Sequence, residues 1–183
     1  LWPESFTGNS WKKAATYVSE PLTNSLLIGL SSSLISMLAA VLLLEFSSKI
    51  AAKFEKLVQI MIYIPMLLPQ ISFLFGIQLG LIKLNINHFY LSVIAVHILF
   101  VLPYCYLSLV GPWRSFDERH MTQALLLSHS RLKSFTHIKL PILWRPLAAS
   151  FALGFAVSIA QYLPTLFIGA GRVSTITTEA VSL

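Results

Sequence analysis

Few side chains in this sequence could bind a polar molecule inside a membrane, and the best placed of them lie close to prolines within long apolar stretches. Gln161 and Tyr162 come shortly before Pro164, and Gln70 follows Pro69. At membrane depth, an amide or a phenol either contacts a polar molecule that passes there or bonds to a neighbouring helix. We predict that Gln70, Gln161 and Tyr162 line a path for a polar solute, with helix packing as the alternative.

The other reactive groups form no catalytic or metal-binding pattern. His97 lies in an apolar stretch where no carboxylate can share its proton, which favours a hydrogen-bonded packing role over a proton relay. Glu45 precedes Lys49 by four residues, the spacing of an interfacial ion pair on a helix. Gln78 has the same two interpretations as Gln70.

Enzymes and nucleic-acid-binding proteins are not favoured. The sequence contains no Gly-rich loop with Lys and Ser or Thr to hold phosphates, and no grouping of Cys, His and carboxylates for a metal. Its one cysteine, Cys105, excludes a disulfide framework. The net charge of +6 is not accompanied by a basic and aromatic pattern of the kind that reads RNA or DNA. We expect no catalytic site, metal, cofactor or nucleic-acid partner.

The composition is that of an integral membrane protein: 56% of the residues are hydrophobic, 11% are charged, and the mean hydropathy is +0.75. Four windows, at about residues 23–46, 57–82, 89–110 and 147–170, approach the roughly 20 apolar residues that cross a bilayer. Their length and their lack of alternation favour helices over strands. We predict a single all-α transmembrane helix bundle over residues 1–183, with about four spans and a long connection at residues 111–146.

Prolines and small residues should shape these helices. Pro21 marks the entry of the first window, where Thr23 or Asn24 can cap the helix. Four prolines within or near the later windows remove backbone hydrogen bonds and should cause kinks: Pro65, Pro69, Pro103 and Pro164. Four serines suit close helix approach, with a solute contact as the alternative: Ser31, Ser32, Ser33 and Ser36.

The basic residues predict the orientation of the chain. Three of the thirteen lie in the first connection, namely Lys49, Lys53 and Lys56. Six lie in the long connection: Arg114, Arg119, Arg131, Lys133, Lys139 and Arg145. By the positive-inside rule, these two connections are cytoplasmic, whereas the connection at residues 83–88 and both ends of the chain face outward.

The long connection predicts two short helices. Ser115-Phe116-Asp117-Glu118 fits a capping box, so one helix should begin there. Residues 128–130 indicate a break, after which Ser130 can cap a second helix that Pro141 ends. In that helix Leu132, Phe135 and Ile138 share one face, and Arg131, Lys133 and Lys139 lie on others. The apolar face must be buried against the bundle, anionic lipid or another protein.

This connection resembles the cytoplasmic loop of the inner-membrane permease subunits of binding-protein-dependent ABC importers. That loop has the pattern Glu-Ala-Ala, three residues, Gly, nine residues, Ile-x-Leu-Pro. Ile138-Lys139-Leu140-Pro141 match its end, with Thr122-Gln123-Ala124 and Ser128 at the Glu-Ala-Ala and Gly positions. A left-handed turn costs a non-Gly residue roughly 1 kcal/mol, so either the turn at Ser128 has another conformation or the loop is divergent. Residues 24–26, Pro69 and residues 97–104 also resemble this family, and residues 161–168 and 175–178 look most like its thiamine, iron(III), sulfate and polyamine branch.

The resemblance implies a subunit that binds no ATP and forms a translocation path in the inner membrane of a bacterium, in contact with lipid. Its partners would be a cytoplasmic ATP-binding subunit, a second permease half in the same or another chain, and a periplasmic substrate-binding protein. The residues implied to dock the ATPase are Glu118, Thr122, Gln123, Ala124, Ser128, Leu132, Phe135, Ile138, Leu140 and Pro141. The solute would be small and polar, with thiamine as an example.

Two other classes are weighed against this one. A secondary transporter or channel would need charged or broken-helix sites within the spans, and an intramembrane enzyme would need a Ser/His, paired Asp or zinc constellation at bilayer depth. The spans supply no interior acid or base beyond His97. Because the sequence begins at Leu1 and stops at Leu183 without a terminal anchor, we expect a fragment of a longer chain. The resemblance, in which two permease halves are often fused, implies that this fragment is most of one half, the C-terminal one.

Overall fold

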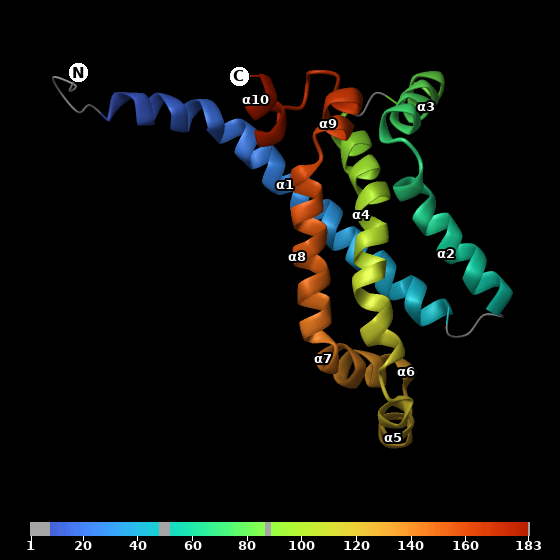
Figure 1. The fold of residues 1–183 in the computed structure, drawn as a ribbon. Coiled ribbons are helices and arrows are strands. Elements are labelled where there is room, and N and C mark those ends of the chain that lie inside the picture. The colour runs from blue at the N-terminus through green and yellow to red at the C-terminus, as the bar shows by residue number, and fades with distance from the viewer. Residues whose placement is uncertain (1–7, 48–51, 87–88, 183) are drawn as a thin grey trace.

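The computed structural model describes residues 8–47, 52–86 and 89–182, which form helices and no strand. The helices are α1 (Asn9–Ser47), α2 (Ala52–Leu67), α3 (Gln70–Lys83), α4 (Phe89–Arg114), α5 (Glu118–Ser128), α6 (Arg131–Ser134), the π-helix η1 (Phe135–Lys139), α7 (Leu140–Ile142), α8 (Trp144–Ala160), α9 (Tyr162–Gly169) and α10 (Ile176–Ser182) (Figure 1). The prediction of an all-α bundle is confirmed.

Two helices are long and apolar enough to cross a membrane alone, Ala15–Ser47 within α1 and Phe89–Arg114, which is α4. Two further segments have the length and hydropathy of a span only with a bend inside them. Glu55–Leu67 and Gln70–Lys83 meet at 105°, and Arg131–Ile142 and Trp144–Ala160 meet at 73°. The described residues therefore supply two to four spans.

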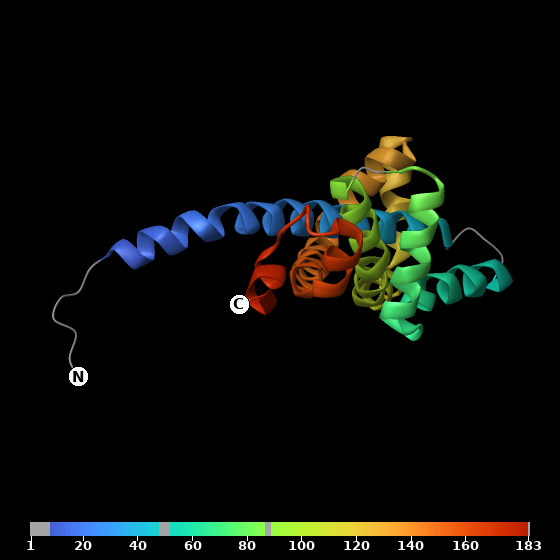
Figure 2. The ribbon, with the colours of Figure 1, turned by 90° about the horizontal axis from the view of Figure 1, so that it is seen from above.

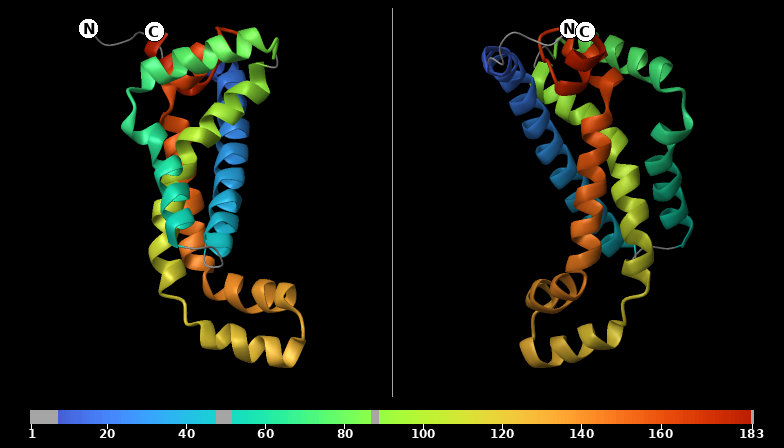
Figure 3. Two further views of the ribbon diagram at one scale, coloured as in Figure 1. Left: turned by 90° about the vertical axis from the view of Figure 1, so that its right-hand side faces the viewer. Right: turned by 60° about the vertical axis from the view of Figure 1, so that its left-hand side comes forward.

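Close packing of α1, α4 and α8 forms the centre of the bundle (Figures 1 and 3). Ser32, Ser33 and Ser36 of α1 are fully buried, as expected for serines that allow close helix approach. Gly154 of α8 lies at the tightest point, because a Cβ atom there would be 2.7 Å from the Cys105 Sγ atom of α4. The sequence places small residues on all three helices at this crossing.

We expect Gly154→Ala to lower the free energy of unfolding by about 1–3 kcal/mol, because the added methyl group overpacks this crossing. Gly80→Ala in α3 is the matched control, since nothing lies within 4 Å of its added Cβ atom. Alanine is also the better helix former by about 1 kcal/mol, so Gly80→Ala should be neutral or stabilising. Thermal unfolding of both variants in detergent checks this, and equal melting temperatures would contradict it.

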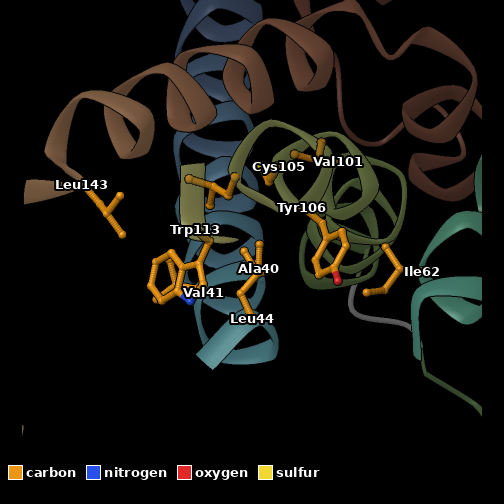
Figure 4. Close-up of a cluster of buried hydrophobic side chains, with 10 residues drawn as sticks. Ala40, Val41, Leu44, Ile62, Val101, Cys105, Tyr106, Trp113 and Leu143 are labelled. Atoms are coloured by element: carbon orange, nitrogen blue, oxygen red, sulfur yellow. The ribbon is translucent and has the colours of Figure 1, made fainter. Parts of the chain in front are cut away.

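The apolar cluster that includes Cys105 continues to the end of the bundle where α4 meets the long connection (Figure 4). Trp113 of α4 and Leu143, which precedes α8, are buried there together with Val41 and Leu44 of α1. Ile62 brings α2 into the same cluster. The connection is therefore attached to the bundle through large buried side chains.

Two of the predicted spans are broken. α2 ends at Leu67 and α3 begins after Pro69, which cannot donate a backbone hydrogen bond. α8 ends at Ala160, four residues before Pro164, because the proline has no N–H for that carbonyl and its ring would clash with it. By contrast, α2 and α4 continue through prolines 65 and 103.

The predicted start of the first span is wrong. α1 begins at Asn9, and Pro21 lies inside it. Thr23 donates its hydroxyl to the Ser19 carbonyl at 2.8 Å within the same helix, so it caps nothing. Asn24 contacts other elements instead of an N-terminus. The N-terminal part of α1 extends beyond the bundle as a continuous helix (Figure 2).

The elements divide between two ends of the bundle. α5, α6, η1 and α7 project beyond the ends of α4 and α8, at the same end as the C-terminus of α1 (Figure 3). α3, α9 and α10 lie at the opposite end (Figure 1). The two features singled out in the sequence, the long connection and the polar groups beside prolines, are therefore separated along the bundle.

Candidate functional site

A cavity of about 550 Å³ lies where the two helix breaks meet the middle of α4. Its lining comprises Pro65, Met66, Leu68, Gln70, Phe100, Tyr104, Val157, Ala160, Gln161, Tyr162 and Leu163. The three residues predicted to line a solute path, Gln70, Gln161 and Tyr162, thus come together at one cavity although 91 positions separate the two glutamines (161 − 70). Gln78 lies elsewhere, beside a separate cavity of about 170 Å³.

Gln161 is the unusual member of this lining. It is only 7% exposed and occupies the break itself, with extended backbone between α8 and α9. Neither its Nε2 nor its Oε1 atom has a hydrogen-bond partner among the described residues. A buried polar group without a partner costs about 1–3 kcal/mol, and the interhelical hydrogen bond that the packing alternative requires is not formed.

A buried polar network fixes the backbone behind Gln161. His97 of α4 contacts the Ser158 Oγ atom of α8 through Nδ1 at 2.8 Å, and the Thr165 Oγ1 atom of α9 through Nε2 at 3.0 Å. Ser158 is in turn 2.8 Å from the Ser32 Oγ atom of α1. His97 is therefore a hydrogen-bonded packing residue, as predicted. The network ties both sides of the α8–α9 break to α1 and α4.

Asn24 and Ser25 of α1 hold the segment that follows α9. Asn24 donates its amide to the Ser174 carbonyl at 2.9 Å, and Ser25 accepts a hydrogen bond from the backbone of Ile176 at 2.9 Å. The Tyr90 hydroxyl of α4 also donates a hydrogen bond to the side-chain Oδ1 atom of Asn24. The sequence marked residues 24–26 through the resemblance, and Asn24 also as a candidate cap, whereas in the structure Asn24 and Ser25 position the segment after α9.

The first helix of the long connection starts two residues later than the capping box predicts. The N-cap of α5 is Asp117, whose carboxylate accepts a hydrogen bond from the backbone of Arg119 at 2.9 Å. Ser115 instead donates its hydroxyl to the Gly111 carbonyl at 3.0 Å and extends the end of α4. Both side chains suit an N-cap, but the serine is still part of the preceding helical turn.

The break between the two short helices is confirmed. α5 ends at Ser128, and Ser130 caps α6 by accepting a hydrogen bond from the backbone of Lys133 at 3.4 Å. The left-handed residue of this turn is His129, with φ of 50°, and not Ser128. Of the two alternatives for Ser128, the structure therefore shows another conformation. The Ser128 hydroxyl lies 2.9 Å from that of Ser134 and links the two helices.

Pro141 does not end the second helix, contrary to the prediction. The helical path continues through α7 to Ile142. The preceding residues Phe135–Lys139 adopt a π-helix, which is wider than an α-helix. Because a proline ring clashes with the carbonyl four residues before it, this widening accommodates Pro141 without a stop.

Lys139 is buried, although the sequence places it on a different face from the apolar residues of its segment. Its side chain is 3% exposed, and its Nζ atom is 2.9 Å from the Glu45 Oε2 atom of α1 and 3.2 Å from the Glu118 Oε1 atom of α5. The ammonium also lies 4.7 Å from the centroid of the Trp113 ring. One cation thus joins α1, α4, α5 and η1. Lys49, the partner predicted for Glu45, lies outside the described residues.

The residues implied to dock an ATPase differ in how far they are exposed on the connection. Exposed are Glu118, Thr122, Gln123, Leu132 and Pro141, and half-buried are Ala124, Ser128, Phe135, Ile138 and Leu140. Leu132 is 73% exposed, whereas the Phe135 ring packs against Trp113 at 6.2 Å between centroids. Both residues line a groove of about 610 Å³ between α1, α5 and α6.

The comparison with known families resolves the class of the protein. Residues 32–182 match the binding-protein-dependent transport system inner membrane component. The chain belongs to this family. The matched region contains both helix breaks, the cavity and the whole connection, so the resemblance seen in the loop extends over the bundle. The family description places this inner membrane component in the same membrane as predicted.

Two curated relatives support the assignment. The inner membrane ABC transporter permease protein YnjC of Escherichia coli (strain K12) is 38% identical over 169 residues, covering 92% of this inner membrane component and 32% of YnjC. The spermidine/putrescine transport system permease protein PotC homolog of Mycoplasma genitalium is 26% identical over 166 residues, covering 88% of the chain and 58% of that protein. The chain thus spans about a third of one relative and somewhat over half of the other.

Proposed function

We propose that this chain forms part of the translocation path of an ABC importer for a small polar solute. A soluble binding protein delivers the solute from the periplasm, a second permease half completes the path, and a separate cytoplasmic ATPase drives the cycle. The observation that carries this proposal is the cavity between two helix breaks, whose lining includes Gln70, Gln161 and Tyr162. Broken spans at a polar site also occur in secondary transporters, and the family match over residues 32–182 favours the ABC importer.

The connection between α4 and α8 is the proposed docking element for the ATPase. It lies at the opposite end of the bundle from α3, α9 and α10 (Figure 3). Its exposed Leu132 lines a groove of about 610 Å³. Lys139 and Trp113 attach it to the bundle. A docking element must be both accessible and firmly attached, and this connection has both properties.

We expect Leu132→Ala to weaken binding of the ATPase roughly tenfold or more, because burying a leucine contributes about 1.5–3 kcal/mol. Co-purification and titration of the ATPase on the complete permease measure this. Leu84→Ala is the matched control, because Leu84 is similarly exposed but follows α3 at the opposite end. Phe135→Ala should weaken binding and also lower stability, since its ring packs against Trp113. If no ATPase travels with the wild-type permease, a secondary transporter or channel becomes the better interpretation.

The orientation is tested by accessibility of single cysteines in a Cys105→Ser background. We expect Gln123→Cys in α5 to resist a membrane-impermeant thiol reagent added from outside, and Asn85→Cys, after α3, to react with it. Both side chains are exposed in the fold, so protection would come from the membrane and not from burial. Reaction at Gln123→Cys without reaction at Asn85→Cys would reverse the topology.

A further inference from the structure

We infer that an anionic phospholipid occupies the cavity of about 170 Å³ beside Gln78, with an acyl chain inside it and the phosphate at Arg172. We call this cavity the α3 crevice, since it lies between α3, the start of α4 and the end of α9. The inference goes beyond the proposed function, because it concerns the membrane around the permease and not the solute. It is carried by the depth of the crevice, its apolar lining and a basic group at its rim.

The crevice lies at the level where a bilayer changes from hydrocarbon to head groups. Between Phe89 and Arg114, α4 contains no Asp, Glu, Lys or Arg, and the rise between these two residues is about 38 Å at 1.5 Å per residue. A hydrocarbon core about 30 Å thick leaves about 4 Å of this helix outside at each end. Phe89 and Ser92, in the first turn of α4, line the crevice. The crevice is therefore at this boundary.

Helix α3 lies along the same boundary and does not cross the membrane. Its 14 residues rise only about 20 Å, and it meets the preceding helical segment Glu55–Leu67 at 105°. Figure 3 shows it running across the end of the bundle. Gln78, Leu81 and Ile82 of α3 line the crevice. Ile82 is 60% exposed and Ile86, also in the lining, is 43% exposed, so the crevice is open toward the surrounding lipid.

The lining of the crevice suits the upper part of a phospholipid chain. It is mostly apolar and contains no Asp, Glu, Lys or Arg. An acyl chain makes van der Waals contacts with such a lining, whereas a charged solute would find no group there to pair with. The polar members are Gln78 and Ser92, whose amide and hydroxyl groups can donate hydrogen bonds to the ester oxygens of a phospholipid.

Arg172 supplies a positive charge at the rim of the crevice. The Cζ atom of its guanidinium lies 4.3 Å from the centroid of the Phe89 ring, which is part of the lining. The Arg172 side chain is exposed and forms no ion pair with a described carboxylate. A guanidinium can bind a phosphate through two parallel hydrogen bonds. Lys83, which follows Ile82 of the lining, adds a second positive charge.

The acidic residues at this end of the bundle lie away from the crevice. The three helices that form it, α3, α4 and α9, contain no Asp or Glu. Glu20 belongs to α1, and Glu179 of α10 accepts a hydrogen bond from the Tyr17 hydroxyl of α1 at 2.6 Å. In Figure 1, α10 and α3 lie on opposite sides of α9. The excess of basic groups at the crevice favours a lipid with a net negative charge over a zwitterionic lipid.

The test uses the complete permease with its ATPase, purified in detergent, in a Cys105→Ser background with Gln78→Cys as the single reactive cysteine. The rate at which N-ethylmaleimide alkylates this cysteine is measured while dioleoyl phosphatidylglycerol or dioleoyl phosphatidylcholine is added. The two lipids have the same chains and differ in the charge of the head group. We expect the anionic lipid to protect the cysteine at a concentration at least about fivefold lower than the zwitterionic lipid. Glycerol 3-phosphate, which lacks the chains, should not protect it.

Arg172→Gln should abolish the preference for the anionic lipid, and Arg172→Lys, which keeps the charge, should retain it. Arg145→Gln is the matched control, because Arg145 also lies near an aromatic ring, 5.8 Å from the centroid of Trp144, but at the opposite end of the bundle. That variant should keep the preference. A permease with Gln70→Cys in place of Gln78→Cys should show no preference, because Gln70 lines the separate cavity of about 550 Å³.

Equal protection by the two lipids, protection by neither, or a preference that survives Arg172→Gln would overturn the inference. Protection by glycerol 3-phosphate at the same concentration as the anionic lipid would assign the crevice to a soluble phosphate ester instead. A Gln78→Cys permease that stays unreactive without lipid would show that another part of the permease covers the crevice, which also overturns the inference. Equal melting temperatures of Arg172→Gln and Arg145→Gln would show that a lost preference reflects the head-group contact and not misfolding.

Discussion

Glu45→Gln should lower the free energy of unfolding by about 3 kcal/mol, because it leaves the buried ammonium of Lys139 without its nearer carboxylate. That ammonium is 2.9 Å from Glu45, whose side chain is 23% exposed, and the Lys139 side chain is itself 3% exposed. Denaturant titration of the purified permease in detergent measures the loss.

Glu118→Gln is the matched control for that prediction. Glu118 contacts the same ammonium at 3.2 Å, but its side chain is 69% exposed, so its contribution should stay below about 1 kcal/mol. The double variant Glu45→Gln with Lys139→Met removes both buried charges and should recover most of the stability. Equal losses from the two glutamate variants would show that burial does not distinguish the pairs.

Gln161→Leu should reduce the transport rate roughly thirtyfold, equivalent to about 2 kcal/mol, while the permease remains at least as stable as the wild type. Its amide makes no hydrogen bond within the described residues, so a leucine of similar size removes an unsatisfied polar group from the fold. The proposed solute path would lose a polar residue of its lining. Transport into proteoliposomes and thermal unfolding of the same preparation measure the two quantities.

The packing alternative for Gln161 predicts the reverse result. Loss of an interhelical hydrogen bond in lipid lowers stability by roughly 0.6–2 kcal/mol, with transport per folded molecule unchanged. Gln78→Leu serves as the control for a polar residue outside the cavity, and its transport should be near normal. Reduced stability with normal transport in Gln161→Leu would remove this residue from the solute path.

The sequence predicted helices where apolar residues are continuous, and it predicted the turn at Ser128 and the cap at Ser130, since these features depend on neighbouring residues. It did not distinguish Pro103, which α4 passes through, from Pro164, which ends α8 four residues earlier. Both prolines remove the same hydrogen bond, and only the packing around each helix decides whether the chain bends or breaks.

Contacts between distant residues were also beyond prediction. Lys139 pairs with Glu45, which lies 94 positions earlier in the sequence. A lysine in an amphipathic segment is expected to be exposed when the segment itself contains no carboxylate that could pair with it in a buried position. The polar residues of the cavity were predicted one at a time, from their depth within apolar windows. Their meeting at a single cavity depends on how α2, α3, α8 and α9 pack around α4.

Helix α1 connects the two ends of the bundle mechanically. Lys139 attaches the connection between α4 and α8 to Glu45, and Asn24 and Ser25 attach the chain after α9 to an earlier part of the same helix. The 22 residues from Asn24 to Glu45 contain no proline, and the 21 steps between these two residues rise about 32 Å at 1.5 Å each, close to the roughly 30 Å of a hydrocarbon core. A displacement of the connection is therefore transmitted as rigid-body motion to the far side of the membrane, without any change in the conformation of α1.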